Sequence, residues 1–77
     1  MKIKVLLFGI LMSESGKQEI EVENVNTVTE LKEKLMKDFP GFAGYQYQVF
    51  VNHKQILGNA TFKQNDEIAL IPPFAGG

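Results

Sequence analysis

The group best placed to do chemistry in this sequence is the α-carboxylate that follows the glycine pair Gly76–Gly77. Glycine makes up about 7 % of residues in average proteins, so a closing pair arises by chance in only about 0.5 % of chains. Without Cβ atoms, the two residues are thin enough to enter a narrow channel and free to adopt the backbone angles it requires. The sequence therefore predicts an end that offers its carboxylate to another protein's active site.

The residues before the glycine pair are suited to carry that carboxylate away from a folded domain. Pro72 and Pro73 fix φ and remove two backbone donors, so a strand must end there and continue as a stiff, extended exit. We predict a domain over residues 1–71 and a flexible tail over residues 72–77, in which Gly77 reacts. The residues predicted to thread the partner's site are Pro72, Pro73, Phe74, Ala75 and Gly76. The alternative is a frayed terminus that happens to end in glycine.

Composition limits what else the chain can do. Its 77 residues suit one small domain, and a net charge of −1 gives no reason to expect nucleic acid or an anionic membrane as a partner. The absence of cysteine excludes disulfides and thiolate chemistry, and the basic residues are all lysine, which disfavours bidentate phosphate recognition. Because apolar runs are short and no signal-peptide pattern opens the chain, we expect a cytoplasmic protein.

Other residues that could carry chemistry have simpler interpretations. Glu19, Glu21 and Glu23 alternate along a predicted strand, where side chains two apart stand about 6.6 Å from each other, too far for a tight carboxylate cage. We interpret them as a solvated edge protected by charge. His53, the single histidine, lies in a predicted turn and is interpreted as structural. The sequence therefore predicts no metal site.

One helix is expected on the strength of its cap and its periodicity. Thr27 and Glu30 have the spacing of a capping box, and Pro40–Gly41 should end the helix before a loop over residues 41–44. An apolar stripe with offsets of three, four and four follows the cap and comprises Val28, Leu31, Leu35 and Phe39.

The remaining apolar pattern predicts strands over residues 2–8, 17–23, 45–52, 54–57 and 67–71, with a one-turn helix possible at residues 10–12 and a tight turn at Asn52–His53. A hairpin, a helix across one face and further strands make an α+β fold of the β-grasp type. Its mixed four- to five-stranded sheet should have the first and last main strands central and parallel.

Strand alternation divides the apolar residues between two faces of that sheet. The set expected beneath the helix is Ile3, Val5, Leu7, Ile20, Val22, Val49, Val51, Ile68 and Leu70. The set left on the opposite face, which we predict to be a partner interface, is Leu6, Phe8, Phe50, Ala69 and Ile71. The alternative is that residues 10–12 fold over this second set and cover it.

The tail and the internal pattern together resemble the ubiquitin-like sulfur carrier family, most closely the small subunits of molybdopterin synthase. Phe8, Gly9, Leu11 and Gly16 match the family's first segment, whereas Met12–Ser13 stand where an Arg–Glu pair is common. Residues 49–52 look like the family's apolar strand ending in Asn, and residues 65–77 are similar to its closing signature, with Asn65 in place of a usual Gly.

The resemblance implies a mechanism and partners. An ATP-dependent activating enzyme would adenylate the Gly77 carboxylate, and sulfur from a persulfide donor would displace AMP to leave a thiocarboxylate. The tail would then enter the large subunit of molybdopterin synthase, in an expected heterotetramer, and give its sulfur to cyclic pyranopterin monophosphate. No bound cofactor is implied, because the acyl-adenylate and the thiocarboxylate are transient forms of the terminus. Catalytic acids and bases would come from the large subunit.

Three other functions fit parts of the sequence. A sulfur carrier of thiamin thiazole synthesis has a similar tail but usually lacks the two prolines. A ubiquitin-like modifier would join Gly77 to a lysine amine, and it shares the adenylation step with the carriers. A β-grasp binding module would need no chemistry at its end.

Overall fold

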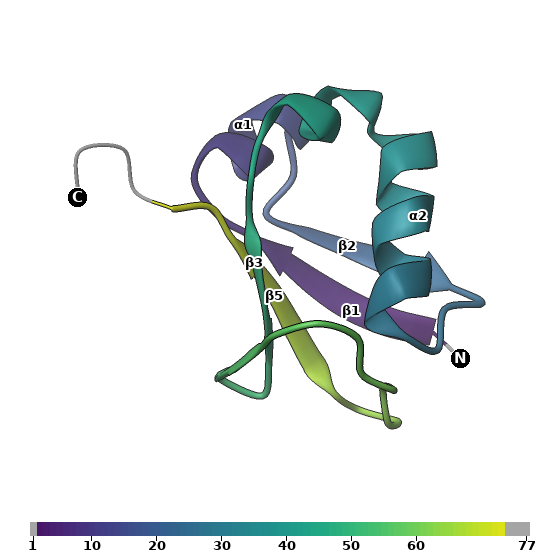
Figure 1. Ribbon diagram of the computed structural model, residues 1–77. Helices are drawn as coiled ribbons and strands as arrows, with labels where there is room; N and C mark the ends of the chain where they lie inside the picture. The colour runs from purple at the N-terminus through teal and green to yellow at the C-terminus, as the bar shows by residue number, and fades with distance from the viewer. Residues whose placement is uncertain (1, 74–77) are drawn as a thin grey trace.

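The computed structural model describes residues 2–73, so Met1 and residues 74–77 lie outside the described part of the chain. Within residues 2–73 a five-stranded sheet is crossed on one face by the main helix (Figure 1). The elements, in order, are β1 (Lys2–Leu7), α1 (Ile10–Ser15), β2 (Glu19–Glu23), α2 (Val28–Asp38), the 3₁₀ helix η1 (Pro40–Gly44), β3 (Gln48–Val51), β4 (Lys54–Ile56) and β5 (Glu67–Ile71). Each helix in this part of the chain falls short of the length and apolar character needed to cross a membrane.

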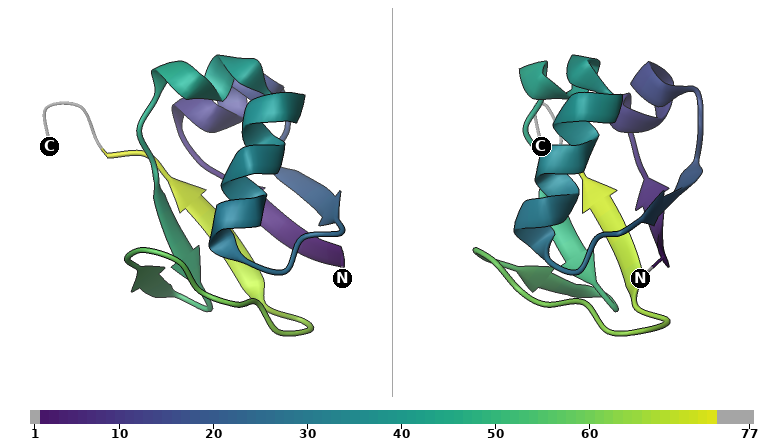
Figure 2. Two further views of the ribbon diagram at one scale, coloured as in Figure 1. Left: turned by 45° about the vertical axis from the view of Figure 1, so that its right-hand side comes forward. Right: turned by 90° about the vertical axis from the view of Figure 1, so that its right-hand side faces the viewer.

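The sheet has the strand order β2-β1-β5-β3-β4, with β1 and β5 as parallel neighbours and the other pairs antiparallel. In the parallel pair Val5 lies opposite Ile68, and Leu7 lies opposite Leu70. This order confirms the predicted β-grasp fold with its first and last strands together. The two views in Figure 2 show α2 lying across the sheet, with α1 and η1 gathered at one end of it.

Helix α2 begins with the predicted capping box. The Thr27 hydroxyl accepts a hydrogen bond from the Glu30 N–H at 3.1 Å. In return a Glu30 carboxylate oxygen accepts the N–H groups of Asn26 at 2.7 Å and Thr27 at 3.2 Å. These bonds satisfy N–H groups that the first turn of a helix leaves without partners. The stripe then turns Val28, Leu31 and Leu35 into the core.

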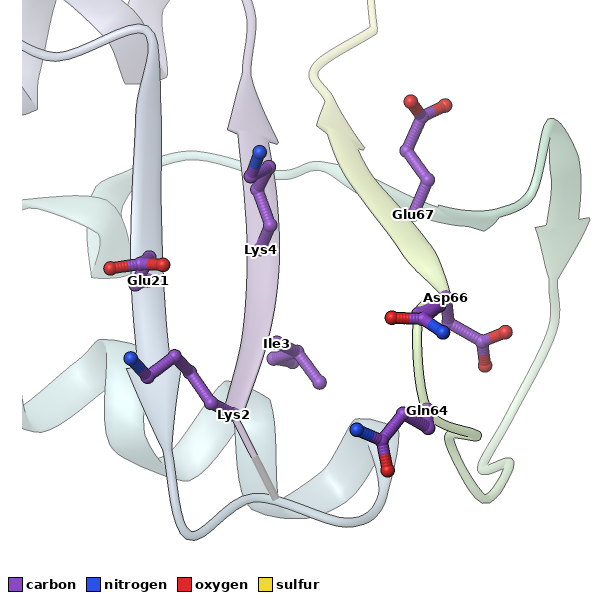
Figure 3. A pocket seen from close by; sticks show the side chains of 8 residues that line it. Lys2, Ile3, Lys4, Glu21, Gln64, Asp66 and Glu67 are labelled. Carbon is purple, nitrogen blue, oxygen red and sulfur yellow. The ribbon is translucent and has the colours of Figure 1, made fainter.

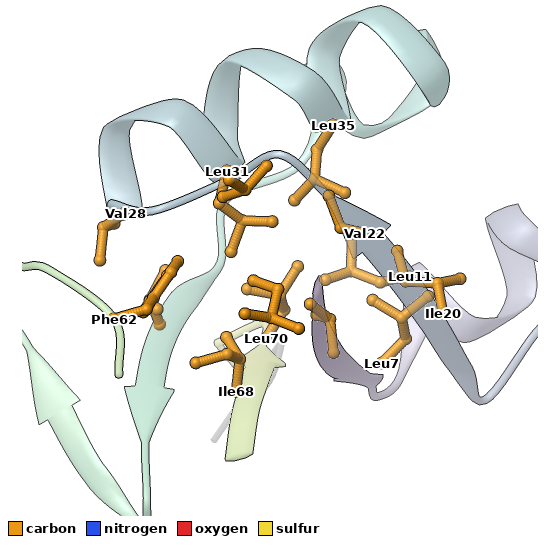
Figure 4. Packing of buried hydrophobic residues seen from close by; sticks show 14 of the residues in the cluster. Leu7, Leu11, Ile20, Val22, Val28, Leu31, Leu35, Phe62, Ile68 and Leu70 are labelled. Carbon is orange, nitrogen blue, oxygen red and sulfur yellow. The ribbon is translucent and has the colours of Figure 1, made fainter. Parts of the chain in front are cut away.

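The core lies between α2 and the covered face of the sheet (Figure 4). It contains the set predicted from alternation, except that Val51 is only half-buried at its edge. Among residues 2–73, four buried residues come from outside the alternating strands and the helix stripe, and these are Leu11, Val25, Phe42 and Phe62. The core therefore draws on connecting segments as well as on the regular elements.

Several boundaries differ from the sequence prediction. The loop expected over residues 41–44 is the 3₁₀ helix η1, because Phe42 turns inward and stacks on Phe39 with ring centroids 5.1 Å apart. The strand expected from Tyr45 starts only at Gln48, since the Tyr45 N–H is bonded to the Phe42 carbonyl. Strand β1 ends at Leu7 rather than Phe8, because the Phe8 carbonyl already accepts the N–H of Leu11 in α1. The predicted strands over residues 17–23 and 54–57 are likewise shorter, as β2 and β4.

The tight turn between β3 and β4 forms where predicted. Asn52 and His53 both have positive φ, at 51° and 72°, which fits a reversal of this kind. The Asn52 side chain also reaches out of the hairpin: its amide donates to an Asp66 carboxylate oxygen at 2.9 Å, and its oxygen accepts the Glu67 N–H at 3.0 Å. The second Asp66 oxygen accepts the Lys63 N–H at 2.7 Å. These bonds tie the hairpin to the start of β5.

Candidate functional site

The described chain ends at the exit predicted for the tail. Strand β5 stops at Ile71, Pro72 is half-buried beyond it, and Pro73 is exposed. The reacting residue Gly77 and the threading residues Phe74, Ala75 and Gly76 lie outside the described residues, so their roles stay predictions. What the structure describes is the surface from which the tail departs.

The sheet face away from α2, here called the open face, holds the predicted interface residues. Leu6 lies opposite Ala69, and Ala69 lies opposite Phe50, so these three form one row across β1, β5 and β3. Ile71 is the next residue of β5 on this face, and all four are half-buried. Phe8, just past the end of β1, is 44 % exposed. The fold thus brings the five residues together, while their role as an interface stays a prediction.

Residues 10–12, the segment that could have folded over the predicted interface residues, do not cover Phe8. Residues 10–12 begin helix α1, which turns Leu11 fully into the core. Ile10 and Met12, on either side of it, are 40 % and 37 % exposed. The exposed Ile10 therefore adds apolar surface beside Phe8.

An apolar groove lies at the tail exit, with a volume of about 740 Å³. One wall is the chain from Phe8 to Ile10, the second is residues 44–46, and the third is Ile71 with the two prolines. The second wall was missed by the sequence analysis, because residues 44–46 lack an apolar period and are distant in sequence from the tail. The Tyr45 hydroxyl in this wall donates to a Glu14 carboxylate oxygen at 3.2 Å, which links the wall to α1. That hydrogen bond, with the nearby negative charge, raises the pKa of Tyr45.

The opposite end of the open face is charged. Lys4 lies between Glu21 on β2 and Glu67 on β5, beside a shallow hollow of about 340 Å³ (Figure 3). Lys4 also approaches Glu19 at 3.7 Å, and Lys2 approaches Glu23 at 3.9 Å, all with exposed side chains. Exposed pairs of this kind contribute little to stability and are screened by salt. Glu19 and Glu23 therefore pair with lysines in water, and Glu21 is exposed opposite Lys4. This agrees with the solvated, charged edge interpreted from the sequence.

His53 also takes the place expected of it, on an exposed turn. Its Nε2 atom lies 3.4 Å from a Glu67 carboxylate oxygen, and the histidine side chain is almost fully exposed. Within residues 2–73, no three His, Asp or Glu side chains gather in a group that could hold a metal ion. In this part of the chain the groove and the open face beside it are the candidate functional site.

Sheet order, helix placement and an exit beside an apolar face define a ubiquitin-like β-grasp domain. Residues 5–77 match the model of the ThiS family, and the chain belongs to that family. Over 81 aligned residues it is 30 % identical to the molybdopterin synthase sulfur carrier subunit of Mycobacterium tuberculosis, covering 99 % of this chain and 98 % of that protein. This homology confirms the resemblance seen in the sequence.

Solved structures agree on the fold. SAMP1 from Haloferax volcanii superposes with a TM-score of 0.84 at 21 % identity, over the full length of both chains. A complex of subunits 1 and 2 of the molybdopterin-converting factor from Helicobacter pylori contains a chain that matches with a TM-score of 0.76 at 25 % identity, again over both full lengths.

Proposed function

We propose that this protein is a sulfur carrier for molybdenum cofactor biosynthesis and acts as the small subunit of a molybdopterin synthase. The observation that carries the proposal is the sequence identity of 30 %, over nearly the full length of both chains, with a sulfur carrier subunit of that enzyme. The closing segment supports it, because Asn65 to Gly77 keeps the turn, the last strand, the two prolines and the glycine pair together.

The chemistry begins at the Gly77 carboxylate. Its oxygen attacks the α-phosphate of ATP on an activating enzyme, and pyrophosphate leaves. A persulfide sulfur then attacks the acyl carbon of the adenylate, and AMP leaves. A second thiol reduces the resulting acyl disulfide, is itself oxidised to a disulfide, and frees the thiocarboxylate. Adenylation must come before the attack by sulfur because a carboxylate is a poor acyl donor, whereas an acyl-adenylate has a good leaving group.

Sulfur transfer follows inside the large subunit. The thiocarboxylate sulfur forms a bond to a carbon of cyclic pyranopterin monophosphate as a bond from that carbon to oxygen breaks and the oxygen group departs, and water then cleaves the acyl–sulfur bond. This returns the Gly77 carboxylate and leaves the sulfur on the pterin. Two deliveries build the dithiolene. In this proposal the carrier binds no resident cofactor, the acids and bases belong to the large subunit, and the reactions take place in the cytoplasm, where ATP is available.

The open face supports a docking step before transfer. Exposed apolar patches on small domains commonly mark partner sites, and this patch lies where the tail departs. We propose that the large subunit covers Leu6, Phe8, Phe50, Ala69 and Ile71 while the tail enters its active site, in an assembly with two copies of each subunit. The activating enzyme needs the same terminus, so the two partners would bind the carrier in turn.

A second candidate is a protein modifier that joins Gly77 to a lysine amine. The likeness to SAMP1 favours it at the level of fold, since small archaeal modifier proteins share this β-grasp architecture. Intact mass of the protein purified from its host separates the two functions. A carrier shows an oxygen-to-sulfur exchange at its terminus, whereas a modifier is found in isopeptide-linked conjugates.

The proposal is tested by adding one residue after Gly77. The extension replaces the reacting carboxylate with an amide, so AMP formation with the activating enzyme should stop while thermal unfolding stays unchanged. Gly76→Val should also fail, because a branched side chain obstructs a narrow channel and restricts the backbone. An extended chain that still turned over at the normal rate would rule out Gly77 as the acyl group.

A further inference from the structure

At the tail exit, Gly9 lies close against the ring of Pro72. A Cβ placed on Gly9 would lie 3.0 Å from Cγ of the Pro72 ring and 3.8 Å from its Cδ. Gly9 also has φ 59° and ψ −131°, a backbone conformation that glycine adopts far more readily than other residues. The bare Cα of Gly9 therefore allows the proline ring to approach the backbone closely.

The Gly9 side of this contact is held firmly. Leu7, two residues before it, is paired with Leu70 of β5 and buried. Leu11, two residues after it, is fully buried. The Gly9 carbonyl accepts the N–H groups of Met12 at 3.1 Å and Ser13 at 3.3 Å. Gly9 is thus a fixed surface against which the tail leaves the sheet.

Pro72, on the other side of this contact, determines the direction in which the tail leaves the sheet. Ile71 is the last residue of β5 and lies opposite Gln48 of β3, so the strand fixes where the tail starts. Pro72 and Pro73 then restrict φ, so the orientation at the first ring is carried into the next residues. We propose that Gly9 is a positioning residue for the reactions at the Gly77 carboxylate. Because Gly9 has no side chain, the Pro72 ring can rest against it, and this contact sets the direction in which the tail leaves the domain.

The direction of the tail at its exit affects the position of the reacting carboxylate at its far end. Extended into a partner's channel, residues 72–77 would span about 16–20 Å, so a tilt of about 10° at the exit displaces the far end by about 3 Å. Reacting atoms must be brought to about 3–3.5 Å, and a misplacement of 1 Å can cost a hundredfold in rate. A small change at Gly9 should therefore lower the reaction rate. Affinity for the large subunit should stay the same, because four of the five proposed docking residues lie on the strands.

The test compares Gly9→Ala with Gly16→Ala. Gly16 closes the same helix α1 with a positive φ of 73°, but a Cβ there would meet nothing within 4 Å. Both variants carry backbone strain, and only Gly9→Ala displaces Pro72. The measurements are single-turnover AMP formation with the activating enzyme and its persulfide donor, affinity for the large subunit, and thermal unfolding. We expect Gly9→Ala to slow AMP formation on the order of tenfold with unchanged affinity, and Gly16→Ala to keep the normal rate.

A double variant shows whether Gly9→Ala slows the reaction by displacing the Pro72 ring. Pro72→Ala alone should slow the reaction because the exit loses its guide, and Gly9→Ala combined with Pro72→Ala should be no slower than Pro72→Ala. Pro73→Ala, which changes a proline that a Cβ on Gly9 would not meet, should have a smaller effect. If Gly9→Ala does not fold, the comparison of Pro72→Ala with Pro73→Ala decides the question, and equal rates would overturn the proposal.

This inference rests on the proposed function, so one measurement is independent of it. Residual dipolar couplings of the Phe74 and Ala75 amides should change in Gly9→Ala, return to the Pro72→Ala values in the double variant, and keep wild-type values in Gly16→Ala. If the wild-type protein forms no AMP with an activating enzyme, the proposed function fails and these couplings alone decide the positioning role. Unchanged couplings in Gly9→Ala, or equal rate losses in Gly9→Ala and Gly16→Ala, would overturn the inference.

Discussion

The two faces of the sheet are built from alternate residues of the same strands, yet they differ sharply in burial. On the covered face Val5, Ile68 and Leu70 are completely buried beneath α2. On the open face their neighbours Leu6 and Ala69 are only half-buried, with apolar atoms still in contact with water. In the proposed function, one alternating pattern serves two purposes. Substitutions on the covered face should reduce the free energy of unfolding, and those on the open face should reduce partner affinity.

The largest effect is expected from the covered face. Leu31→Ala removes a fully buried side chain from the centre of the helix stripe and should lower the free energy of unfolding by about 2–5 kcal/mol. Chemical denaturation gives this value, with Lys32→Ala, an exposed neighbour on the same helix, as the control. An unchanged unfolding midpoint in Leu31→Ala would mean that the division between the faces is drawn in the wrong place.

The next largest effect is expected on the open face, where a substitution should lower partner affinity and leave stability nearly unchanged. Phe8→Ala should weaken binding to the large subunit by about 1 kcal/mol or more, the scale of an interface anchor, with little loss of stability. Phe74→Ala carries the same expectation from the sequence. Calorimetric titration measures the affinity, and Met36→Ala, which truncates an exposed apolar residue on α2, is the matched control. Normal affinity in both phenylalanine variants, or unfolding of Phe8→Ala, would contradict the comparison.

A smaller effect tests whether the helix that covers one face depends on its cap. Thr27→Ala removes the hydroxyl that accepts the Glu30 N–H, and should lower the free energy of unfolding by about 1 kcal/mol. Partner affinity per folded molecule should stay the same, because the cap lies on the covered side of the sheet. Thr29→Ala changes the same residue type two positions later and serves as the control. Equal stability in both variants would show that the cap is not needed.

The smallest effect is expected at the charged end of the open face and depends on pH. The Lys63 backbone N–H and the Asn52 amide, which donate to the Asp66 carboxylate, lower its pKa below the ordinary value of 3.8. Because the folded-state pKa is the lower one, the stabilisation is fully present above the ordinary pKa and is lost as the pH falls through the folded-state pKa. Asp66→Asn should therefore be less stable than wild type at about pH 6, and the difference should shrink as the pH falls through the lowered pKa of Asp66. A difference that did not change with pH would assign the effect to geometry instead of charge.

Features governed by local periodicity or by short-range hydrogen bonds could be predicted from the sequence. The two faces follow from the two-residue period of strands, so alternation by itself assigns Val5 to the covered face and Leu6 to the open face. The capping box depends on residues three apart, and the turn at Asn52–His53 depends on residue types that tolerate positive φ. The parallel central pair follows from the order of elements and the rules of chain connection.

Features that join distant segments could not be predicted in this way. Phe42 and Phe62 lie outside any regular period, and their burial depends on tertiary contacts. The Phe62 N–H, for example, is bonded to the Asn26 carbonyl at 2.7 Å. The groove has the same origin, because Tyr45 lies at the end of η1 and meets the tail exit only through the tertiary fold. The close approach of Gly9 to Pro72 joins two residues separated by nearly the whole chain, and the alternation of neither strand indicates it.

The central position of β5 has a consequence for how the protein is made. Strand β5 separates the β1–β2 hairpin from the β3–β4 hairpin, so a nascent chain that lacks residues 67–71 has two hairpins with no strand between them. Small two-stranded hairpins are marginal in water, and contacts between distant segments form slowly. We therefore expect stable folding on the ribosome to wait until β5 has left the exit tunnel. Nascent chains stopped before residue 67 should remain sensitive to protease, so unfinished chains would not present the proposed docking face to a partner.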